Sequence, residues 1–359
     1  MEPIKEALTF DDVLLIPRYS SVLPSETNLK VDLGANLKLK VPFLSSAMDT
    51  VTESSMAISM AKEGGLGVIH RNLSIKDQAN EVKKVKRKNL IVAAAIGTSG
   101  DDLTRAKTLI DCGVDLLVID TAHGHSEKVI KTLFKVKKIK TKISICVGNI
   151  ASAEAAKELY NEGANILKVG IGPGSICTTR MIAGIGMPQI SAVMEVKKIL
   201  KNKKIKIISD GGIKFSGDIA KGLAAGADAI MMGSIFAGTD ESPGKKFKYK
   251  NKFYKSYRGM GSIGAMSAGS SNRYFQKNHK DKSKFVPEGV EARVEYKGSV
   301  GKILYQLKGG LRSSMGYIGA KNIYDIQKKA KFVKITKAGF YESMVHSVEM
   351  VNKVVNYKL

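Results

Sequence analysis

The amino-acid sequence predicts an α/β protein built as a closed (β/α)8 (TIM) barrel with a long insertion after the eighth strand. Two observations predict it. Eight short apolar or β-branched runs occur between Val41 and Ser234, and each leads into a turn and a segment of helical periodicity. Strands that alternate with helices pair in parallel through right-handed crossovers. The fingerprint of the rival open sheet, GxGxxG, is missing, because GIGPGS at 170–175 has the wrong spacing.

The segments between the expected strands have the pattern of amphipathic helices. TESSMAISMAKEG and SAEAAKELYNEGA place apolar residues three and four positions apart and contain glycine near their ends. The eight expected strands, in chain order, are VPFLSSAM (41–48), GLGVIH (65–70), LIVAAAIG (90–97), DLLVID (115–120), KISICVGN (142–149), ILKVGIG (166–172), KIISDGG (206–212) and AIMMGS (229–234).

After the eighth expected strand the pattern changes. KKFKYKNKFYKSYRG predicts a hairpin that turns at Lys250–Asn251, and a segment rich in glycine, serine and lysine follows it. Loops this long in a compact domain are usually disordered or form functional lids. We therefore expect residues 240–305 to form a hairpin and a mobile flap, inserted in a single domain of residues 1–359.

The composition is that of a globular protein with a sizeable core, since 43% of the 359 residues are hydrophobic. No apolar run approaches the roughly 18 residues that span a bilayer, and the N-terminus lacks a signal-peptide core. We expect a cytoplasmic protein with no membrane contact. The three cysteines form no CxxC pair, which argues against a disulfide framework or structural zinc. Cys112 and Cys146 lie in apolar runs and are expected in the core, whereas Cys177 lies among glycine, serine and threonine.

The formal net charge of +25 suggests nucleic acid as one class of partner. The basic residues are mostly lysines in runs that interleave with apolar residues, as on solvated helix faces. A specific nucleic-acid function is therefore not favoured. The same positive field would attract an anionic small substrate.

Polar residues and glycines gather where the expected strands end. Functional groups of such barrels lie at the C-terminal ends of the strands, so this rim predicts the active site. The glycines of SDGG and MGS lie in the two loops that bind phosphate through backbone N–H groups, which predicts a phosphorylated substrate. If the glycines served only tight turns, that role would explain one of the two sets, but it would poorly explain both sets in the two loops that bind phosphate. The rim comprises Ser46, Met48, His70, Gly97, Asp120, His123, Asn149, residues 170–177, Asp210, Gly211, Gly212, Gly233 and Ser234.

Eight further motifs carry a family resemblance: SSAMDTVTE, GGLGVIHRN, IDTAHGHS, GIGPGSICTTR, SDGGIKFSGDIAKGLAAGAD, YRGMGS, NRYF and PEGVEA. With them the chain resembles the inosine 5′-monophosphate (IMP) dehydrogenase family over nearly its whole length. The resemblance implies an enzyme of guanine nucleotide biosynthesis that oxidises IMP to xanthosine 5′-monophosphate (XMP) with NAD. It also implies that Cys177 adds to C2 of the purine and that the covalent thioimidate formed by hydride transfer is then hydrolysed. Sulfur suits both steps, because a thiolate is strongly nucleophilic and can later leave.

The resemblance also implies which residues bind the substrate and NAD. Asp120 would accept the hydroxyls of the nicotinamide ribose, and the adenine end would reach a neighbouring subunit. A surface or capping role is the alternative for His123. The implied sets are Ser46, Ser175, Asp210, Gly212, Gly233, Ser234 and Tyr257 for ribose and phosphate; Met48, Asn149, Met260, Gly261 and Glu288 for the purine; Asp120, Thr121, His123, Gly170 and Gly172 for NAD; and Ser20, Pro24, Gly316 and Tyr317 for NAD across the interface.

For the hydrolytic step the resemblance implies that the flap acts as a lid. Arg273 and Tyr274, in NRYF, match a water-activating arginine and its companion tyrosine. Arginine normally stays protonated, with a pKa above about 12, so its action as a base needs a special environment. Thr179 offers a proton relay as the alternative.

A monovalent cation, usually potassium, and a tetramer also follow from the resemblance. Oxygen ligands from a glycine-rich backbone suit such a hard, weakly charged ion. The implied site consists of the main-chain carbonyls of Gly172, Gly174 and Cys177, completed by Glu342, Ser343 and Met344 of a neighbouring subunit.

The sequence departs from the family pattern at residues 86–90. Members commonly carry a tandem pair of CBS regulatory modules between the second helix and the third strand, but here helix passes to strand almost directly. Either the lineage lacks these modules or they were excised, and allosteric control through them is not predicted. GMP reductase, which shares the barrel but runs a reductive deamination with NADPH, is the nearest alternative. NRYF and PEGVEA in a long lid favour the dehydrogenase.

Overall fold

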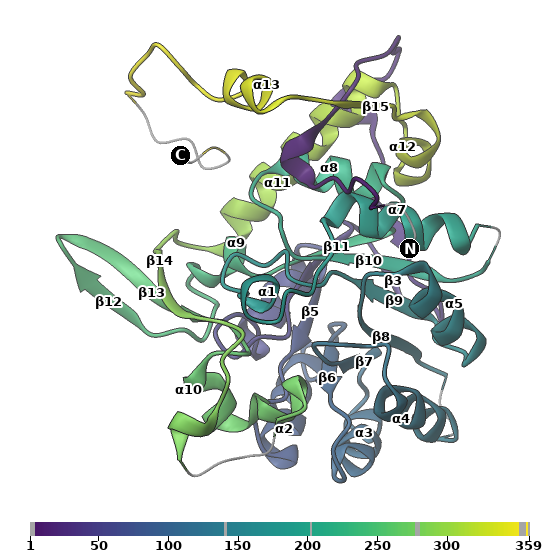
Figure 1. Cartoon of the computed structure of the whole chain (residues 1–359), viewed down its shortest axis with the longest axis vertical. Coiled ribbons are helices and arrows are strands. Elements are labelled where there is room, and N and C mark those ends of the chain that lie inside the picture. Colours follow the sequence, from purple (N-terminus) through teal and green to yellow (C-terminus); the bar gives the residue numbers. More distant parts are fainter. Residues whose placement is uncertain (1–3, 140–141, 202, 277–280, 352–356, 358–359) are drawn as a thin grey trace.

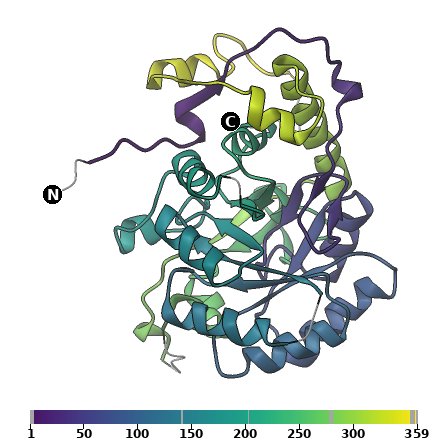
Figure 2. The same cartoon turned by 90° about the vertical axis from the view of Figure 1, so that its right-hand side faces the viewer.

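Eight parallel strands close into a barrel, which confirms the predicted fold class (Figure 1, Figure 2). The computed structural model describes residues 4–139, 142–201, 203–276, 281–351 and 357. The last barrel strand pairs back to the first, so the barrel has no free edge. The strands are β4 (Phe43–Ser45), β5 (Leu66–Ile69), β6 (Ala93–Ile96), β7 (Leu116–Asp120), β8 (Ser144–Ile150), β9 (Ile166–Val169), β10 (Lys206–Asp210) and β11 (Ala229–Met232).

Amphipathic helices cover the outside of the barrel. In α2 the Ser74 hydroxyl caps the N-terminus by accepting from the backbone N–H of Asp77, and Ala79, Val82 and Val85 bury one face. The eighth helical position, between α8 and α1, is filled by α11 (Val300–Ile318). The other helices of the ring are α1 (Ser54–Lys62), α2 (Ile75–Lys86), α3 (Asp102–Asp111), α4 (Glu127–Lys137), α5 (Ala153–Asn161), α7 (Gln189–Ile199) and α8 (Ser216–Ala224).

Two layers of apolar side chains hold the barrel together. One fills its interior, where residues such as Leu66, Val118 and Ile208 are fully buried. The hairpin of β2 (Val31–Asp32) and β3 (Lys38–Leu39) adds leucines to this cluster from the N-terminal end of the strands. The other layer lies between the strands and the helices. With one end closed by the hairpin, the C-terminal end is left for function.

The insertion lies between the last barrel strand and α11, and it is more regular than the predicted loop. The hairpin of β12 (Lys246–Tyr249) and β13 (Lys252–Arg258) turns at Lys250–Asn251, as predicted, and β14 (Glu291–Glu295) adds a third strand. Between β13 and β14, serines and glycines form short turns: α10 (Ile263–Ala265), the π-helical η3 (Met266–Ser270) and the 3-10 turns η4 (Ser271–Tyr274) and η5 (Lys282–Lys284). Residues 277–280 of the predicted flap lie outside the described residues.

Segments from the two ends of the chain lie together beside the barrel (Figure 2). They pair because β1 (Val13–Leu15) forms an antiparallel sheet with β15 (Phe332–Lys334), a pairing the sequence did not predict. The remaining short elements are η1 (Phe10–Asp12), η2 (Pro24–Glu26), α6 (Thr179–Ile182), α9 (Ser234–Ala237), α12 (Ile323–Lys329) and α13 (Lys337–Glu342).

Two expectations about the chain's organisation can be compared with these elements. The connection from α2 to β6 spans residues 87–92 only, so no module lies at the predicted place of the CBS pair. Of the helices in the described ranges, none is both long and apolar enough to cross a bilayer.

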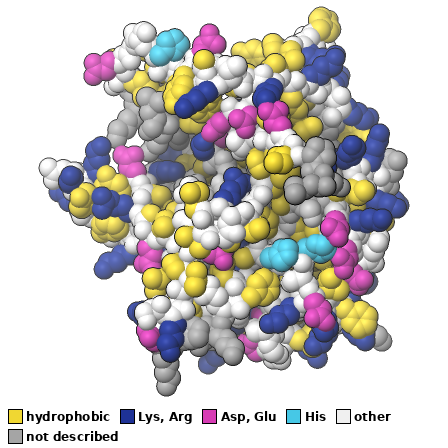
Figure 3. Space-filling model, viewed as in Figure 1, with side chains coloured by type: hydrophobic (Ala, Val, Ile, Leu, Met, Phe, Trp, Pro, Cys, Tyr) yellow, Lys and Arg dark blue, Asp and Glu magenta, His cyan; other side chains and the backbone are white. Residues whose placement is uncertain are grey.

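Lysine and arginine side chains are scattered over the face seen in Figure 3 and form no single patch there.

Candidate active site

A pocket opens at the C-terminal ends of the barrel strands, where the polar rim was predicted. The structure brings most of the predicted site residues to its wall: Ser46, Met48, Asp120, Asn149, Gly170, Gly172, Gly174, Ser175, Cys177, Thr179, Asp210, Gly212, Gly233, Ser234, Tyr257, Met260, Arg273, Tyr274 and Glu288.

The loop that carries Cys177 leaves β9 and is fixed at both ends. At Gly170 a Cβ atom would lie 2.2 Å from the carbonyl oxygen of Asp210, so only glycine permits this approach. Farther along, the backbone N–H of Thr178 donates to the carbonyl of Glu288 at 3.0 Å, and that of Val290 donates to Ile176 at 3.1 Å. The insertion therefore pairs with the cysteine loop as a short antiparallel bridge.

Cys177 differs from the other two cysteines, as predicted. Its thiol is half-buried at the pocket and donates to the Thr179 hydroxyl, with Sγ and Oγ1 3.3 Å apart. Cys146 is buried inside the barrel, where burial raises the pKa of its thiol to about 12. A buried thiol that resists ionisation is inert. Cys112 is half-buried rather than in the core as predicted, but it packs against the layer between strands and helices and does not line the pocket, so Cys177 is the reactive candidate.

Hydroxyls and glycines form the side of the pocket at the ends of β10 and β11. Ser46, Gly212, Gly233 and Ser234 come from different loops and meet here, beside the Tyr257 hydroxyl. Burial raises the pKa of Tyr257, so its phenol stays protonated and able to donate. This wall offers neutral hydrogen-bond donors, which suit an anionic group.

Two carboxylates at the pocket share one buried cation that sequence reasoning missed. The Lys168 ammonium lies 2.8 Å from Oδ1 of Asp120 and 2.9 Å from Oδ2 of Asp210, and it also donates to the Asn149 side chain. Burial would lower the pKa of Lys168, but the two carboxylates raise it. A lysine inside the apolar run ILKV was the available signal, because a charge on a barrel strand needs a partner.

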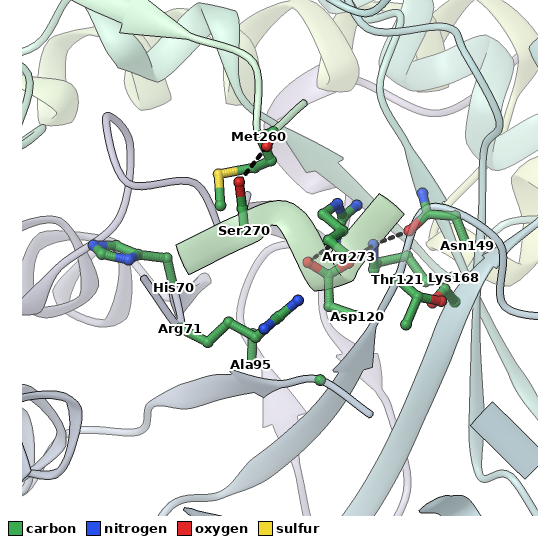
Figure 4. Close-up of polar contacts among 12 residues, drawn as sticks. His70, Arg71, Ala95, Asp120, Thr121, Asn149, Lys168, Met260, Ser270 and Arg273 are labelled. Carbon is green, nitrogen blue, oxygen red and sulfur yellow. Dashed lines mark hydrogen bonds and ion pairs between the residues drawn. The ribbon is translucent and has the colours of Figure 1, made fainter. Parts of the chain in front are cut away.

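The segment between β13 and β14, called the lid below, borders the pocket and reaches the Asp120 carboxylate. Arg273 forms an ion pair with Asp120, as Figure 4 shows, and the Arg273 carbonyl accepts from the backbone N–H of Ala122 at 3.0 Å. Burial would lower the pKa of Arg273, but Asp120 raises it above its usual range. Tyr274 packs on Gly261, where a Cβ would lie 2.7 Å from the ring.

Three residues that the resemblance assigned to the substrate or NAD lie outside the pocket wall, as do His70 and Gly97 of the predicted rim. Thr121 is fully buried and its hydroxyl donates to the carbonyl of Gly148 at 3.1 Å, so its contact is structural. His123 is exposed, with its ring beside that of His125. Gly261 packs behind the wall, where its carbonyl accepts from the backbone N–H of Glu288 at 3.0 Å and its Cα faces the Tyr274 ring.

The residues predicted to act across an interface form a separate group. Pro24 lies against Gly316, Ser20 lies against the neighbouring Gly319, and Tyr317 is 68% exposed. Glu342 ends α13 and Ser343 and Met344 follow it, and none of the three lines the pocket. Figure 1 shows α13 apart from the barrel strands. Neither group contributes to the pocket of its own chain.

Comparison with known proteins identifies the relatives of this chain. Residues 7–346 match the family model described as IMP dehydrogenase / GMP reductase domain. The chain is 48% identical to inosine-5′-monophosphate dehydrogenase of Cryptosporidium parvum, covering 99% of this chain and 98% of the relative. It is 48% identical to the enzyme of that name from Borreliella burgdorferi, covering 96% and 98%. It is 39% identical to the enzyme of that name from Bacillus subtilis, covering 99% of this chain and 98% of the relative. That alignment has 483 positions, so it includes stretches of the relative that this chain of 359 residues lacks.

Proposed function

The chain belongs to the IMP dehydrogenase / GMP reductase family, and on this premise we propose that it oxidises IMP to XMP with NAD. The reaction is an oxidoreductase step of guanine nucleotide biosynthesis. The observation that carries the proposal is one pocket that joins a half-buried thiol, a wall of neutral donors and two carboxylates held by one buried lysine. The enzyme acts in the cytoplasm, where its three free cysteines stay reduced.

IMP binds with its phosphate and ribose against the donor wall and its purine over Cys177. Ser46, Ser175, Gly212, Gly233, Ser234 and Tyr257 hold the phosphate and ribose, and Asp210 accepts ribose hydroxyls. The Lys168 ammonium, 2.9 Å from Oδ2 of Asp210, orients this carboxylate. Met48, Asn149, Met260, Gly261 and Glu288 position the purine.

The first chemical stage forms and oxidises a covalent adduct. The Cys177 thiolate adds to C2 of the purine, so a C–S bond forms and the electron pair of the C2–N double bond moves onto nitrogen. Loss of hydride from C2 then restores the double bond and leaves a thioimidate. When bound, NAD accepts this hydride.

The chain's own groups fit NAD, because the Asp120 carboxylate borders the pocket and can accept two ribose hydroxyls. Gly170 and Gly172, which have no side chains, leave room for the nicotinamide beside the Asp120 carboxylate. Thr121 and His123 follow Asp120 at the end of β7. Asp120 cannot bind the ribose and Arg273 through the same oxygens at once. Hydride transfer therefore proceeds with the lid open, and hydrolysis follows with the lid closed.

The second stage releases XMP. Water adds to C2 of the thioimidate and loses a proton, and sulfur leaves as the Cys177 thiolate. Because Asp120 keeps Arg273 protonated in the closed lid, we assign Arg273 to orienting the water and stabilising hydroxide rather than to holding its proton. The Thr179 hydroxyl passes that proton to the departing Cys177 sulfur, 3.3 Å from Oγ1, which restores the thiol, and Tyr274 completes the wall.

Potassium and a homotetramer complete the proposal. The cysteine loop offers the carbonyls of Gly172, Gly174 and Cys177, which suit a hard monovalent ion. Glu342, Ser343 and Met344 lie away from the pocket of their own chain, so a neighbouring subunit has to supply them. Ser20, Pro24, Gly316 and Tyr317 form a surface that a neighbour's adenosine can reach. Light scattering after gel filtration, with and without potassium, tests both features.

The reaction is tested with two substrate pairs. Incubation with IMP and NAD is expected to give NADH and XMP, with a rapid first turnover of NADH. Incubation with GMP and NADPH is the control for the reductase activity that the family name also covers. NADPH oxidation with GMP, together with no NADH from IMP, would overturn the proposal.

A further inference from the structure

We propose that Arg71 positions the lid for the hydrolytic step by holding Asn272, the residue before Arg273. The inference deepens the proposed function and rests on it. Arg71 follows β5, and its Nη2 donates to Oδ1 of Asn272 over 2.7 Å. The two residues are 201 positions apart in the chain, so this contact exists only when the lid lies on the barrel.

The burial of Arg71 gives the contact its importance. Arg71 is 9% exposed, and within the described ranges its guanidinium has no ion-pair partner within 4.0 Å. The carboxylate of Asp102 lies near it but is committed elsewhere. It accepts from the backbone N–H groups of Gly97 at 2.8 Å and Ser99 at 2.7 Å and lies 3.6 Å from Nε of Arg105. Without Asn272, a buried cation would lose its side-chain acceptor.

Arg71 also lies where it can define the place of Arg273. In Figure 4 its side chain extends toward Asp120 and Arg273, beneath the lid segment. Arg273 is already held at its guanidinium by Asp120 and at its carbonyl by the backbone N–H of Ala122. The contact at Asn272 adds a third fixed point within two residues, which leaves the Arg273 side chain little freedom.

The base of the lid is held by other groups. Nη2 of Arg258 lies 2.6 Å from Oδ2 of Asp49, and Nδ2 of Asn72 lies 3.0 Å from the same oxygen and 3.3 Å from the carbonyl of Ala265. These contacts involve residues before η3. Loss of the Arg71 contact therefore loosens the end of the lid that carries Arg273, which keeps its contacts with Asp120 and Ala122, while the base stays attached.

The neutral acceptor explains why closure remains reversible. A carboxylate at position 272 would form a buried ion pair with Arg71, and such a pair is costly to separate. The Asn272 amide offers a single charge-assisted hydrogen bond, which stabilises the closed lid without locking it. A catalytic cycle that opens the lid for NAD and closes it for water needs this intermediate strength.

Hydrogen exchange tests the contact independently of activity. Backbone amides of residues 266–276 are compared in the full-length protein and in Asn272→Ala and Arg71→Met. Both variants are expected to exchange about tenfold faster in this segment, since one charge-assisted hydrogen bond is lost. Asn272→Asp is expected to slow exchange. Unchanged protection in Asn272→Ala would overturn the proposal, even if Arg71→Met failed to fold.

Kinetics show whether the contact positions the lid for hydrolysis. Asn272→Ala is expected to lower steady-state turnover about tenfold and to leave the NADH burst rate within about twofold, because only hydrolysis needs the closed lid. Arg71→Lys, which keeps the positive charge, is expected to lose less steady-state turnover than Arg71→Met. Equal slowing of both stages would contradict the positioning role. If the wild-type protein forms no NADH from IMP, the proposed function fails, while hydrogen exchange still decides the contact.

Arg105→Met is the matched control. Arg105 is 7% exposed on the same side of the barrel, but its hydrogen bonds go to the carbonyl of Leu73 and the side chain of Gln78, which belong to the barrel. This variant is expected to lose stability and to keep lid protection and the ratio of burst to turnover. A loss of lid protection in Arg105→Met equal to that in Arg71→Met would overturn the assignment.

Discussion

Asp120 and Asp210 stand on either side of one buried ammonium group, that of Lys168, at 2.8 and 2.9 Å. In the proposed mechanism the first carboxylate serves NAD and the second serves IMP. One lysine thus orients the acceptors of both sites. It also remains beside Asp120 when Arg273 leaves with the lid.

Lys168→Met is expected to destabilise the fold by about 3–5 kcal/mol, because it leaves the buried Asp120 and the partly buried Asp210 without their shared cation. Urea unfolding at pH 7 measures the loss. Lys168→Arg, which keeps the charge, is the control and is expected to lose less. A Lys168→Met protein as stable as the wild type would show that the carboxylates gain solvent or a proton at little cost.

Cys177→Ser is expected to abolish NADH formation and covalent labelling by IMP, since a serine hydroxyl is a far weaker nucleophile than a thiolate. Intact-protein mass spectrometry after mixing with IMP and NAD detects the adduct. Cys146→Ala is the control for labelling, because that thiol is buried away from the pocket wall. Substantial NADH production by Cys177→Ser would rule out the assigned nucleophile.

Arg273→Ala is expected to slow hydrolysis much more than hydride transfer, by about 100-fold against a small change, since only the second stage uses the closed lid. Rapid mixing should then show a burst of NADH followed by slow turnover and accumulation of the thioimidate. If both stages slow equally, Arg273 does not serve the water step.

Gly261→Ala is expected to disturb the lid, because a Cβ there would lie 2.7 Å from the Tyr274 ring. Turnover should fall while the NADH burst persists. Gly309→Ala is the matched control, since a Cβ added at this position of α11 would point into open space. That control is expected to raise the free energy of unfolding by about 0.5–1 kcal/mol without changing kinetics. Unchanged turnover in Gly261→Ala would mean that Tyr274 needs no support from this contact.

Stability is expected to fall in acid partly because of Asp120. Burial alone would raise the pKa of Asp120, but Arg273 and Lys168 hold it well below its usual range. The unfolded chain, with a pKa near about 3.9, binds a proton first as pH falls, so the stabilisation is complete above that value and is lost below it. Asp120→Asn should flatten the fall in unfolding free energy between about pH 5 and pH 3, as measured by urea titration. An identical acid profile would contradict this origin.

The sequence by itself determined the barrel and most of its site. Eight apolar runs, each followed by a helical pattern, specify parallel strands, and parallel strands bring their C-terminal ends to one rim. Asp120, Cys177 and Asp210 could be assigned to that rim because each lies at or just after a predicted strand end. The hairpin turn at Lys250–Asn251 was also readable, because its signal is local.

Only the tertiary structure decided which charged and polar groups of the site pair with one another. Lys168 sits between two carboxylates that are 48 and 42 positions away in sequence, and Arg273 reaches Asp120 from an insertion that follows the last barrel strand. The pairing of Thr178 with Glu288 and of Arg71 with Asn272 is equally remote. No local propensity encodes such contacts. They arise because the barrel closes on its apolar layers and leaves buried charges that only distant segments can satisfy.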